Sequence, residues 1–133
     1  MPALSTFLVE DSPVIQHSLI ATLQELAPVT VVGVAEDEQA ALHWLAQPTH
    51  GADLVIVDIF LRSGSGLGVL RAARQRWPQR PMVVLSNYAT ADMRTTCLAL
   101  GAQRVFDKST EIEALILYCQ TLAGAARAGA ATA

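Results

Sequence analysis

The sequence predicts a single doubly wound α/β domain built on a five-stranded parallel sheet, and three observations support this fold class. Short apolar runs alternate with stretches of helical spacing five times along the chain. The runs are almost continuously apolar, which is typical of strands that helices cover on both faces. The chain has 133 residues, of which 52% are hydrophobic, so it can bury one core and little else.

The strands are expected where β-branched and apolar residues gather. In chain order, the five runs are residues 6–9, 29–35, 54–58, 82–86 and 104–107. Alternation of such runs with helices implies right-handed crossovers and helices on both faces of the sheet. In an open parallel sheet, ligands bind beyond the carboxyl ends of the strands. The residues that close each run are therefore the candidates for a functional site.

The helices are expected between these runs, where apolar residues recur at helical spacing. The stripes that define the first three helices are Ile15, Leu19, Leu23 and Leu26; Ala41, Leu42 and Leu45; and Leu67, Leu70 and Ala73. The last two helices are expected at 92–100 and 111–122. Ser12 followed by Pro13 is typical of a helix start, and Gly101 is suited to end the fourth helix. Residues 1–123 should form the domain, and the low-complexity residues 124–133 a flexible tail.

Charged and hydroxyl side chains follow or close four of the predicted strands. They are Glu10 and Asp11, then Asp58, then Ser86, and finally Asp107 with Lys108. Carboxylates that crowd at one edge of a sheet repel each other, and a hard divalent cation such as Mg2+ would relieve this repulsion. Asp58 is then a candidate nucleophile for a phosphoryl group, and Lys108 and Ser86 are candidates for binding the phosphoryl oxygens.

These motifs resemble those of response regulator receiver domains, the phosphoacceptor half of two-component signalling systems. The matching segments are Val9-Glu10-Asp11-Ser12, Val57-Asp58-Ile59, Gly66, Leu85-Ser86-Asn87 and Asp107-Lys108-Ser109. The resemblance covers residues 4 to about 122 and implies a flavodoxin-like strand order, 2-1-3-4-5.

By this resemblance, Asp58 would receive phosphate from a histidine kinase or a phosphotransfer protein. Glu10, Asp11, Asp58 and the carbonyl of Phe60 would hold Mg2+, while Lys108 and Ser86 would bind the phosphoryl group. The chain would be a signalling protein that catalyses its own phosphotransfer and autodephosphorylation, not an enzyme with an external substrate. The fourth helix, the fifth strand and the fifth helix would form its partner-binding surface, through which two copies could dimerise.

Three positions, 60, 88 and 105, bear on how such a domain would work. The aromatic residue that usually lies three residues before the lysine is replaced by Val105, and Phe106 should point to the other face of the sheet. An alternative function is therefore a receiver-like interaction module that works without phosphorylation. Phe60 and Tyr88 occupy the two positions that tune hydrolysis in this family, and both are expected to obstruct water and prolong the acyl phosphate.

Composition and spacing argue against several other functions. The net charge of -3 and the pI near 5.5 provide no basic field for nucleic acid. No apolar run approaches the length of about 18 residues that a membrane span needs, so a cytoplasmic protein is expected. Cys97 and Cys119 lack a CxxC or histidine-rich neighbourhood and should be reduced core thiols.

Two rival activities lack a residue that each requires. A phosphatase that forms an aspartyl-phosphate would need an acid two residues after its nucleophile, where this chain has Phe60. A dinucleotide-binding loop is suggested by the glycines of 64–68, but these follow the third strand, and Val69 stands where the last glycine belongs.

Overall fold

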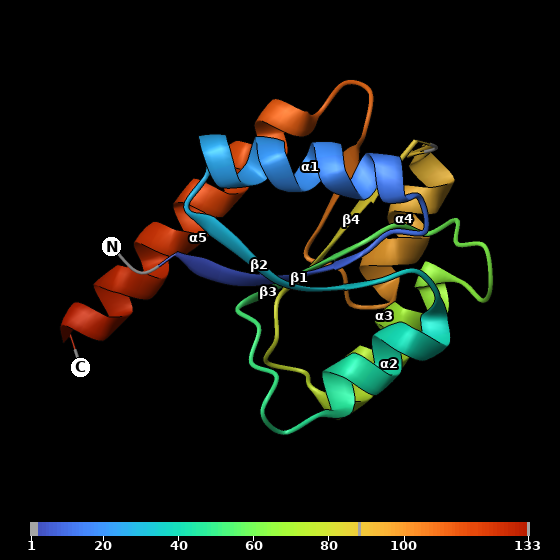
Figure 1. Ribbon diagram of the computed structural model, residues 1–133, viewed down its shortest axis with the longest axis horizontal. Coiled ribbons are helices and arrows are strands. Elements are labelled where there is room, and N and C mark those ends of the chain that lie inside the picture. The colour runs from blue at the N-terminus through green and yellow to red at the C-terminus, as the bar shows by residue number, and fades with distance from the viewer. Residues whose placement is uncertain (1–2, 88, 133) are drawn as a thin grey trace.

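The computed structural model describes residues 3–87 and 89–132, and it shows strands and helices in strict alternation (Figure 1). In chain order the elements are β1 (Leu4–Val9), α1 (Pro13–Leu26), β2 (Val29–Ala35), α2 (Glu38–Ala46), β3 (Leu54–Val57), α3 (Gly66–Arg76), β4 (Met82–Ser86), α4 (Ala91–Ala99), β5 (Arg104–Asp107) and α5 (Ile112–Thr132). The five strands are parallel, in the order β2-β1-β3-β4-β5. The predicted fold class and strand order are confirmed.

Two hydrophobic cores lie on opposite faces of this sheet. One joins the sheet to α1 and α5, and the other joins it to α2, α3 and α4 (Figure 1). Within β5, Val105 packs in the core beside α4, whereas Phe106 is fully buried in the core beside α1 and α5. The prediction that these two side chains point to opposite faces is confirmed.

Local sequence accounts for how several helices begin and end. The Ser12 hydroxyl accepts from the Ile15 N–H at 3.3 Å, and Pro13 is the first residue of α1. Gly101, which follows α4, has a φ of +110°, a left-handed conformation that favours glycine. Both signals act as the sequence predicts.

Two features differ from the sequence-based expectation. The prediction that every strand is covered on both faces is wrong for β2, where Val32 and Val34 are 44% and 38% exposed. This strand lies at the edge of the sheet, where it has a neighbouring strand on one side only. In addition, the last helix was expected to end at residue 122, but α5 continues as a helix to Thr132 and extends past the sheet (Figure 1). The division into a domain at 1–123 and a flexible tail stays a prediction.

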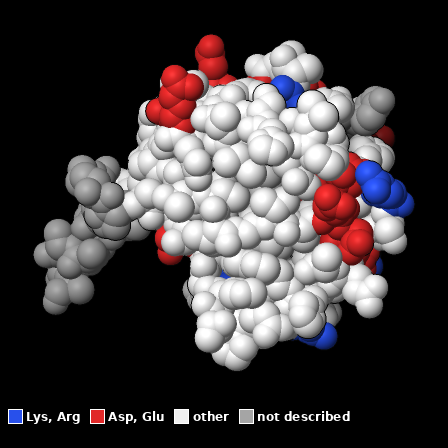
Figure 2. Space-filling model, viewed as in Figure 1, with Lys and Arg blue, Asp and Glu red and all other residues white. Residues whose placement is uncertain are grey.

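Charge is sparse over the face of the molecule that Figure 2 shows. Acidic side chains lie mainly toward the margins of this face, its middle is uncharged, and Lys and Arg do not gather into a patch on it. No helix in the described part of the chain is both long and apolar enough to cross a membrane.

Candidate functional site

The register of β1 and β3 brings two acidic residues together at the carboxyl edge of the sheet. Val9 and Val57 are partners on these neighbouring strands, and the Asp58 N–H donates to the Val9 carbonyl oxygen at 2.9 Å. Glu10 and Asp58 follow the two valines directly. Parallel pairing therefore starts both carboxylate side chains from adjacent positions.

The register of β4 and β5 adds a hydroxyl and an ammonium group on the other side. Ser86, which is fully buried, pairs with Asp107, and the Lys108 N–H donates to the Ser86 carbonyl oxygen at 3.0 Å. The Lys108 side chain then reaches the acidic residues, with Nζ 2.8 Å from Asp58 Oδ2. Lys108 Nζ also donates to Glu10 Oε1.

Three carboxylates form a compact cluster beside Lys108. Glu10, Asp11 and Asp58 each offer an oxygen, and these oxygens lie within 4.8 Å of one another. Glu10 is only 2% exposed and Asp58 only 8%. Main-chain groups bind both, because the Ser12 N–H donates to Glu10 Oε2 at 3.0 Å and the Phe60 N–H donates to Asp58 Oδ1 at 3.2 Å.

Burial and ion pairing act on the proton affinity of two of these groups. Burial raises the pKa of the Glu10 carboxyl, and hydrogen bonds from Lys108 and the Ser12 N–H offset only part of this effect. For Lys108, burial by itself would lower the pKa, but the hydrogen bonds to Asp58 and Glu10 outweigh it and raise the pKa above its usual value. Lys108 is therefore held in its charged form next to Asp58.

The residues present fit a hard divalent cation. The cluster offers carboxylate oxygens, which are the ligands that Mg2+ prefers. Among the described residues, Lys108 is the one cationic side chain within ion-pair distance of these carboxylates. Three carboxylates and one ammonium leave an excess of negative charge that a divalent cation would neutralise.

A tight loop follows Asp58 and fixes the start of α3. Phe60 and Ser65 form an isolated antiparallel bridge, and the Gly66 N–H donates to the Ile59 carbonyl oxygen at 3.0 Å. A Cβ atom on Gly66 would overlap the Asp58 carbonyl oxygen. This close approach explains the glycine that the sequence motif carries at position 66.

The predicted aromatic neighbours of the site are placed only in part. Phe60 begins the loop and is 50% exposed, and the role of its carbonyl group as a metal ligand stays a prediction. Tyr88 lies outside the described residues, so its predicted effect on hydrolysis stays a prediction as well.

Two residues near the site were not predicted. The Gln16 side chain donates from Nε2 to the main-chain carbonyl oxygen of Glu10. Arg94 in α4 donates to the Val105 carbonyl oxygen and pairs with Glu111. A polar residue on an amphipathic helix is usually solvated, so neither position stands out in the sequence.

The profile of the response regulator receiver domain family matches residues 6–120 of the chain. This chain belongs to the response regulator receiver domain family. The resemblance drawn from the five motifs is confirmed, and the receiver domain is assigned to two-component signalling. Receiver domains bind Mg2+ at an acidic pocket, and the Glu10, Asp11 and Asp58 cluster is an acidic group of this kind.

Curated relatives of the receiver domain are longer proteins. The chain is 31% identical over 120 residues to a probable transcriptional regulatory protein of Picosynechococcus sp.. The alignment covers 86% of this chain and 47% of that protein. The chain is also 31% identical over 110 residues to a protein-glutamate methylesterase/protein-glutamine glutaminase of Trichodesmium erythraeum, covering 81% of this chain and 31% of that protein. The chain thus spans less than half the length of these relatives.

Solved structures share the receiver fold at low sequence identity. A LuxR-family two-component response regulator of Aurantimonas sp. has a TM-score of 0.82 at 21% identity, over 92% of this chain and 86% of that chain. The receiver domain of a Francisella response regulator has a TM-score of 0.78 at 20% identity, over 90% of this chain and 95% of that chain.

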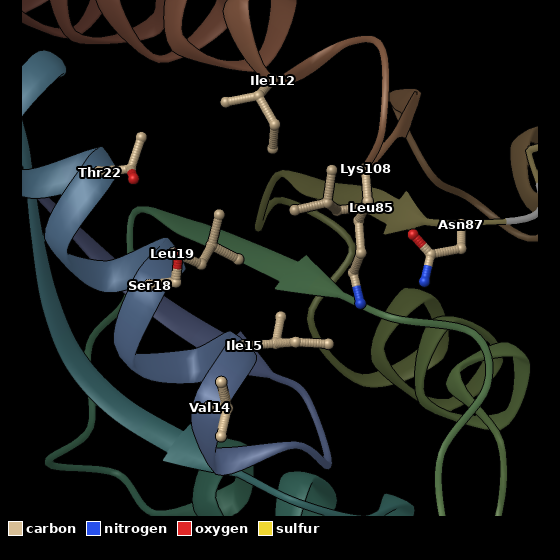
Figure 3. A pocket seen from close by; sticks show the side chains of 9 residues that line it. All are labelled: Val14, Ile15, Ser18, Leu19, Thr22, Leu85, Asn87, Lys108 and Ile112. Carbon is tan, nitrogen blue, oxygen red and sulfur yellow. The ribbon is translucent and has the colours of Figure 1, made fainter.

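A cavity of about 400 Å³ opens beside the site, between α1 and the start of α5. Val14, Ile15 and Ser18 line it from α1 and Ile112 from α5, while the ammonium group of Lys108 lies at the end of β3 (Figure 3). Val14 is 79% exposed at its rim. The cavity is therefore a mostly apolar hollow, with Lys108 in its lining next to the acidic cluster.

Proposed function

We propose that this receiver domain accepts a phosphoryl group on Asp58 from a phosphohistidine or a small acyl phosphate and signals through a changed partner-binding surface. One observation carries the proposal. Lys108 Nζ lies 2.8 Å from Asp58 Oδ2, and both groups adjoin the acidic pair Glu10 and Asp11. A buried carboxylate with a paired ammonium, beside carboxylates that can bind a divalent cation, is suited to forming an acyl phosphate.

The reaction transfers one phosphoryl group from a phosphorylated donor to the unphosphorylated Asp58 carboxylate. An oxygen of the Asp58 carboxylate bonds to phosphorus as the bond between phosphorus and the donor atom breaks, and the donor imidazole or carboxylate leaves with the electron pair. Lys108 is charged and within reach of Asp58, so it can neutralise a phosphoryl oxygen. Ser86, at the end of the neighbouring strand β4, is proposed to donate its hydroxyl to a second phosphoryl oxygen.

The bound cation would be held by Glu10, Asp11 and Asp58 together with the Phe60 carbonyl group. Mg2+ supplies positive charge that offsets the negative charge of the phosphoryl oxygens. The protein contributes orientation, because the Phe60 N–H holds Asp58 Oδ1 at 3.2 Å while Lys108 holds Oδ2 at 2.8 Å. Both carboxylate oxygens are thus oriented before a donor arrives.

Two surfaces are proposed for partners. A histidine kinase or phosphotransfer protein would dock beside the exposed side of α1, where Val14 and Ser18 border the cavity next to Lys108. The face of α4, β5 and α5 would bind a downstream partner or a second copy, and it exposes Leu98 to 50% and Leu117 to 62%. These two leucines are the exposed apolar side chains that such a partner would cover.

The second candidate function is an interaction module that does not depend on phosphorylation. Val105 favours it, because a buried valine offers no aromatic ring to reorient when a phosphoryl group binds. The complete acidic cluster and its paired lysine favour the phosphoacceptor function instead.

Intact-mass analysis after incubation with acetyl phosphate, with and without Mg2+, tests the proposal. We expect one phosphate to be added to the unsubstituted protein in Mg2+ and none to Asp58→Asn. No adduct with acetyl phosphate, phosphoramidate or a set of phosphorylated histidine kinases would overturn the proposal and favour the interaction module.

A further inference from the structure

The loop between β3 and α3 wraps around one residue of α2, Glu38. The Glu38 N–H donates to the Ser63 carbonyl oxygen at 3.3 Å, and the Ser65 N–H donates to Glu38 Oε1 at 2.9 Å. Between these contacts, Gly64 has a φ of +75°, a left-handed conformation that glycine adopts without strain. Main-chain groups of the loop thus bind Glu38 on both sides of Gly64.

Two glycines make room for the Glu38 side chain. A Cβ atom on Gly64 would lie 2.5 Å from Glu38 Cβ. A Cβ atom on Gly68 would lie 2.5 Å from Glu38 Cδ and from each of its two carboxylate oxygens. A side chain at position 68 would therefore displace the carboxylate from the Ser65 N–H.

Gly68 is the third residue of α3, which is the position that normally closes a capping box. Ser65 is the N-cap, and its hydroxyl accepts from the Leu67 N–H at 3.1 Å. In a capping box, a Glu or Gln at the third helical position reaches back to the N–H of the N-cap residue. Here that position is glycine, and Glu38 from another helix binds the N–H in its place. The carboxylate also lies at the positive end of the α3 dipole.

The capped residue is linked to the phosphoacceptor through the loop. Ser65 forms an antiparallel bridge with Phe60, whose N–H donates to Asp58 Oδ1 at 3.2 Å. We infer that Glu38 is a positioning residue, which caps α3 from the neighbouring helix and thereby holds the loop that orients the Asp58 carboxylate. Its effect on phosphotransfer rests on the proposed function of Asp58.

Moving the carboxylate from α2 to α3 tests this inference. Glu38→Ala removes the cap, Gly68→Glu alone forces two glutamates into one space, and the double variant restores a capping box within α3. We expect each single substitution to slow phosphorylation by acetyl phosphate by about fivefold or more, as loss of one capping contact would. The double variant should recover to within about twofold of the unsubstituted protein. Gln39→Ala, an exposed neighbour on α2, is the control and should react at the unsubstituted rate.

Hydrogen exchange of the Ser65 amide is the second measurement, and it does not depend on phosphate. Exchange should be faster in Glu38→Ala and slow again in the double variant. The inference is overturned if Glu38→Ala keeps both the unsubstituted rate and the Ser65 protection, or if a folded double variant reacts as slowly as Glu38→Ala. If the unsubstituted protein takes up no phosphate, the proposed function fails, while Ser65 exchange still decides whether Glu38 caps α3.

Discussion

Arg94 of α4 donates from Nη1 to the main-chain carbonyl oxygen of Val105 in β5, at 2.9 Å. The same guanidinium donates from Nε to the Ala89 carbonyl oxygen at 3.0 Å and pairs with the Glu111 carboxylate. One side chain therefore joins the β4–α4 loop, β5 and the segment that leads into α5. It does so at the strand position where the resemblance led us to expect an aromatic residue and this chain has valine.

Replacing Arg94 should loosen this junction. We expect Arg94→Met to lower the free energy of unfolding by about 1–2 kcal/mol, because a charged donor to several acceptors is lost from a half-buried position. Arg94→Lys should also have a lower free energy of unfolding than the unsubstituted protein, since an ammonium group cannot reproduce the planar arrangement of donors in a guanidinium. Urea unfolding measures the stability of both variants. If Arg94→Met is as stable as the unsubstituted protein, Arg94 does not stabilise this junction.

Glu111 should make stability depend on pH. The hydrogen bond from Arg94, followed by that from the Asp107 N–H, lowers the pKa of Glu111 below its usual 4.5. A carboxyl whose pKa is lowered by folding stabilises the protein above its ordinary pKa, and this contribution is lost as the pH falls through the lower, folded value. The stability difference between the unsubstituted protein and Glu111→Gln should therefore shrink below pH 4.5. A difference that stays constant on acidification would contradict the assignment.

Removing Lys108 should separate stability from cation binding. Lys108→Met leaves Glu10 and Asp58 buried without their ammonium partner, which should cost about 3–5 kcal/mol of stability. Added Mg2+ should then raise the melting temperature more in this variant than in the unsubstituted protein, because repulsion between the carboxylates is greater. Phosphorylation should be lost. Arg71→Met, which removes an exposed cation, is the control and should change none of these quantities.

Gly66→Ala should strain the loop that carries the phosphoacceptor. Its Cβ would meet the Asp58 carbonyl oxygen and the Ile59 backbone, and overpacking of this kind costs about 1–3 kcal/mol. Phosphorylation by acetyl phosphate should slow as well. Gly124→Ala provides the matched control, because a Cβ there would meet nothing within 4 Å beyond its chain neighbours and the backbone of its own helix, and alanine favours the helix. Equal stability of the two variants would argue against the close approach at Gly66.

Phe60→Ala should shorten the lifetime of the acyl phosphate. Phe60 is 50% exposed and lies two residues after Asp58, so loss of its ring should open a path for water with little effect on folding. Phe60→Tyr keeps the bulk of the ring and should keep the lifetime of the unsubstituted protein. The decay of the phosphorylated mass over time measures both variants. An unchanged half-life in Phe60→Ala would show that the ring does not shield the phosphoryl group.

Much of the candidate site could be predicted because its residues close parallel strands. Glu10, Asp58 and Lys108 come together because they follow parallel strands whose register aligns their ends, and Ser86 ends a strand at the same edge of the sheet. The helix signals at Ser12 and Gly101 also depend only on neighbouring residues. The prediction for β2 was wrong because an apolar run does not reveal whether its strand lies inside the sheet or at the edge.

By itself, the sequence determined the alternation of strands and helices, the receiver family and the residues that gather at the carboxyl edge of the sheet. These properties arise from local periodicity and from motifs of a few residues. Only the tertiary structure decided that Glu38 lies over Gly68 and that Arg94 binds the Val105 carbonyl oxygen. Such contacts depend on how helices and loops pack against one another across the fold, and neither the spacing of apolar residues nor the ends of strands encodes that packing.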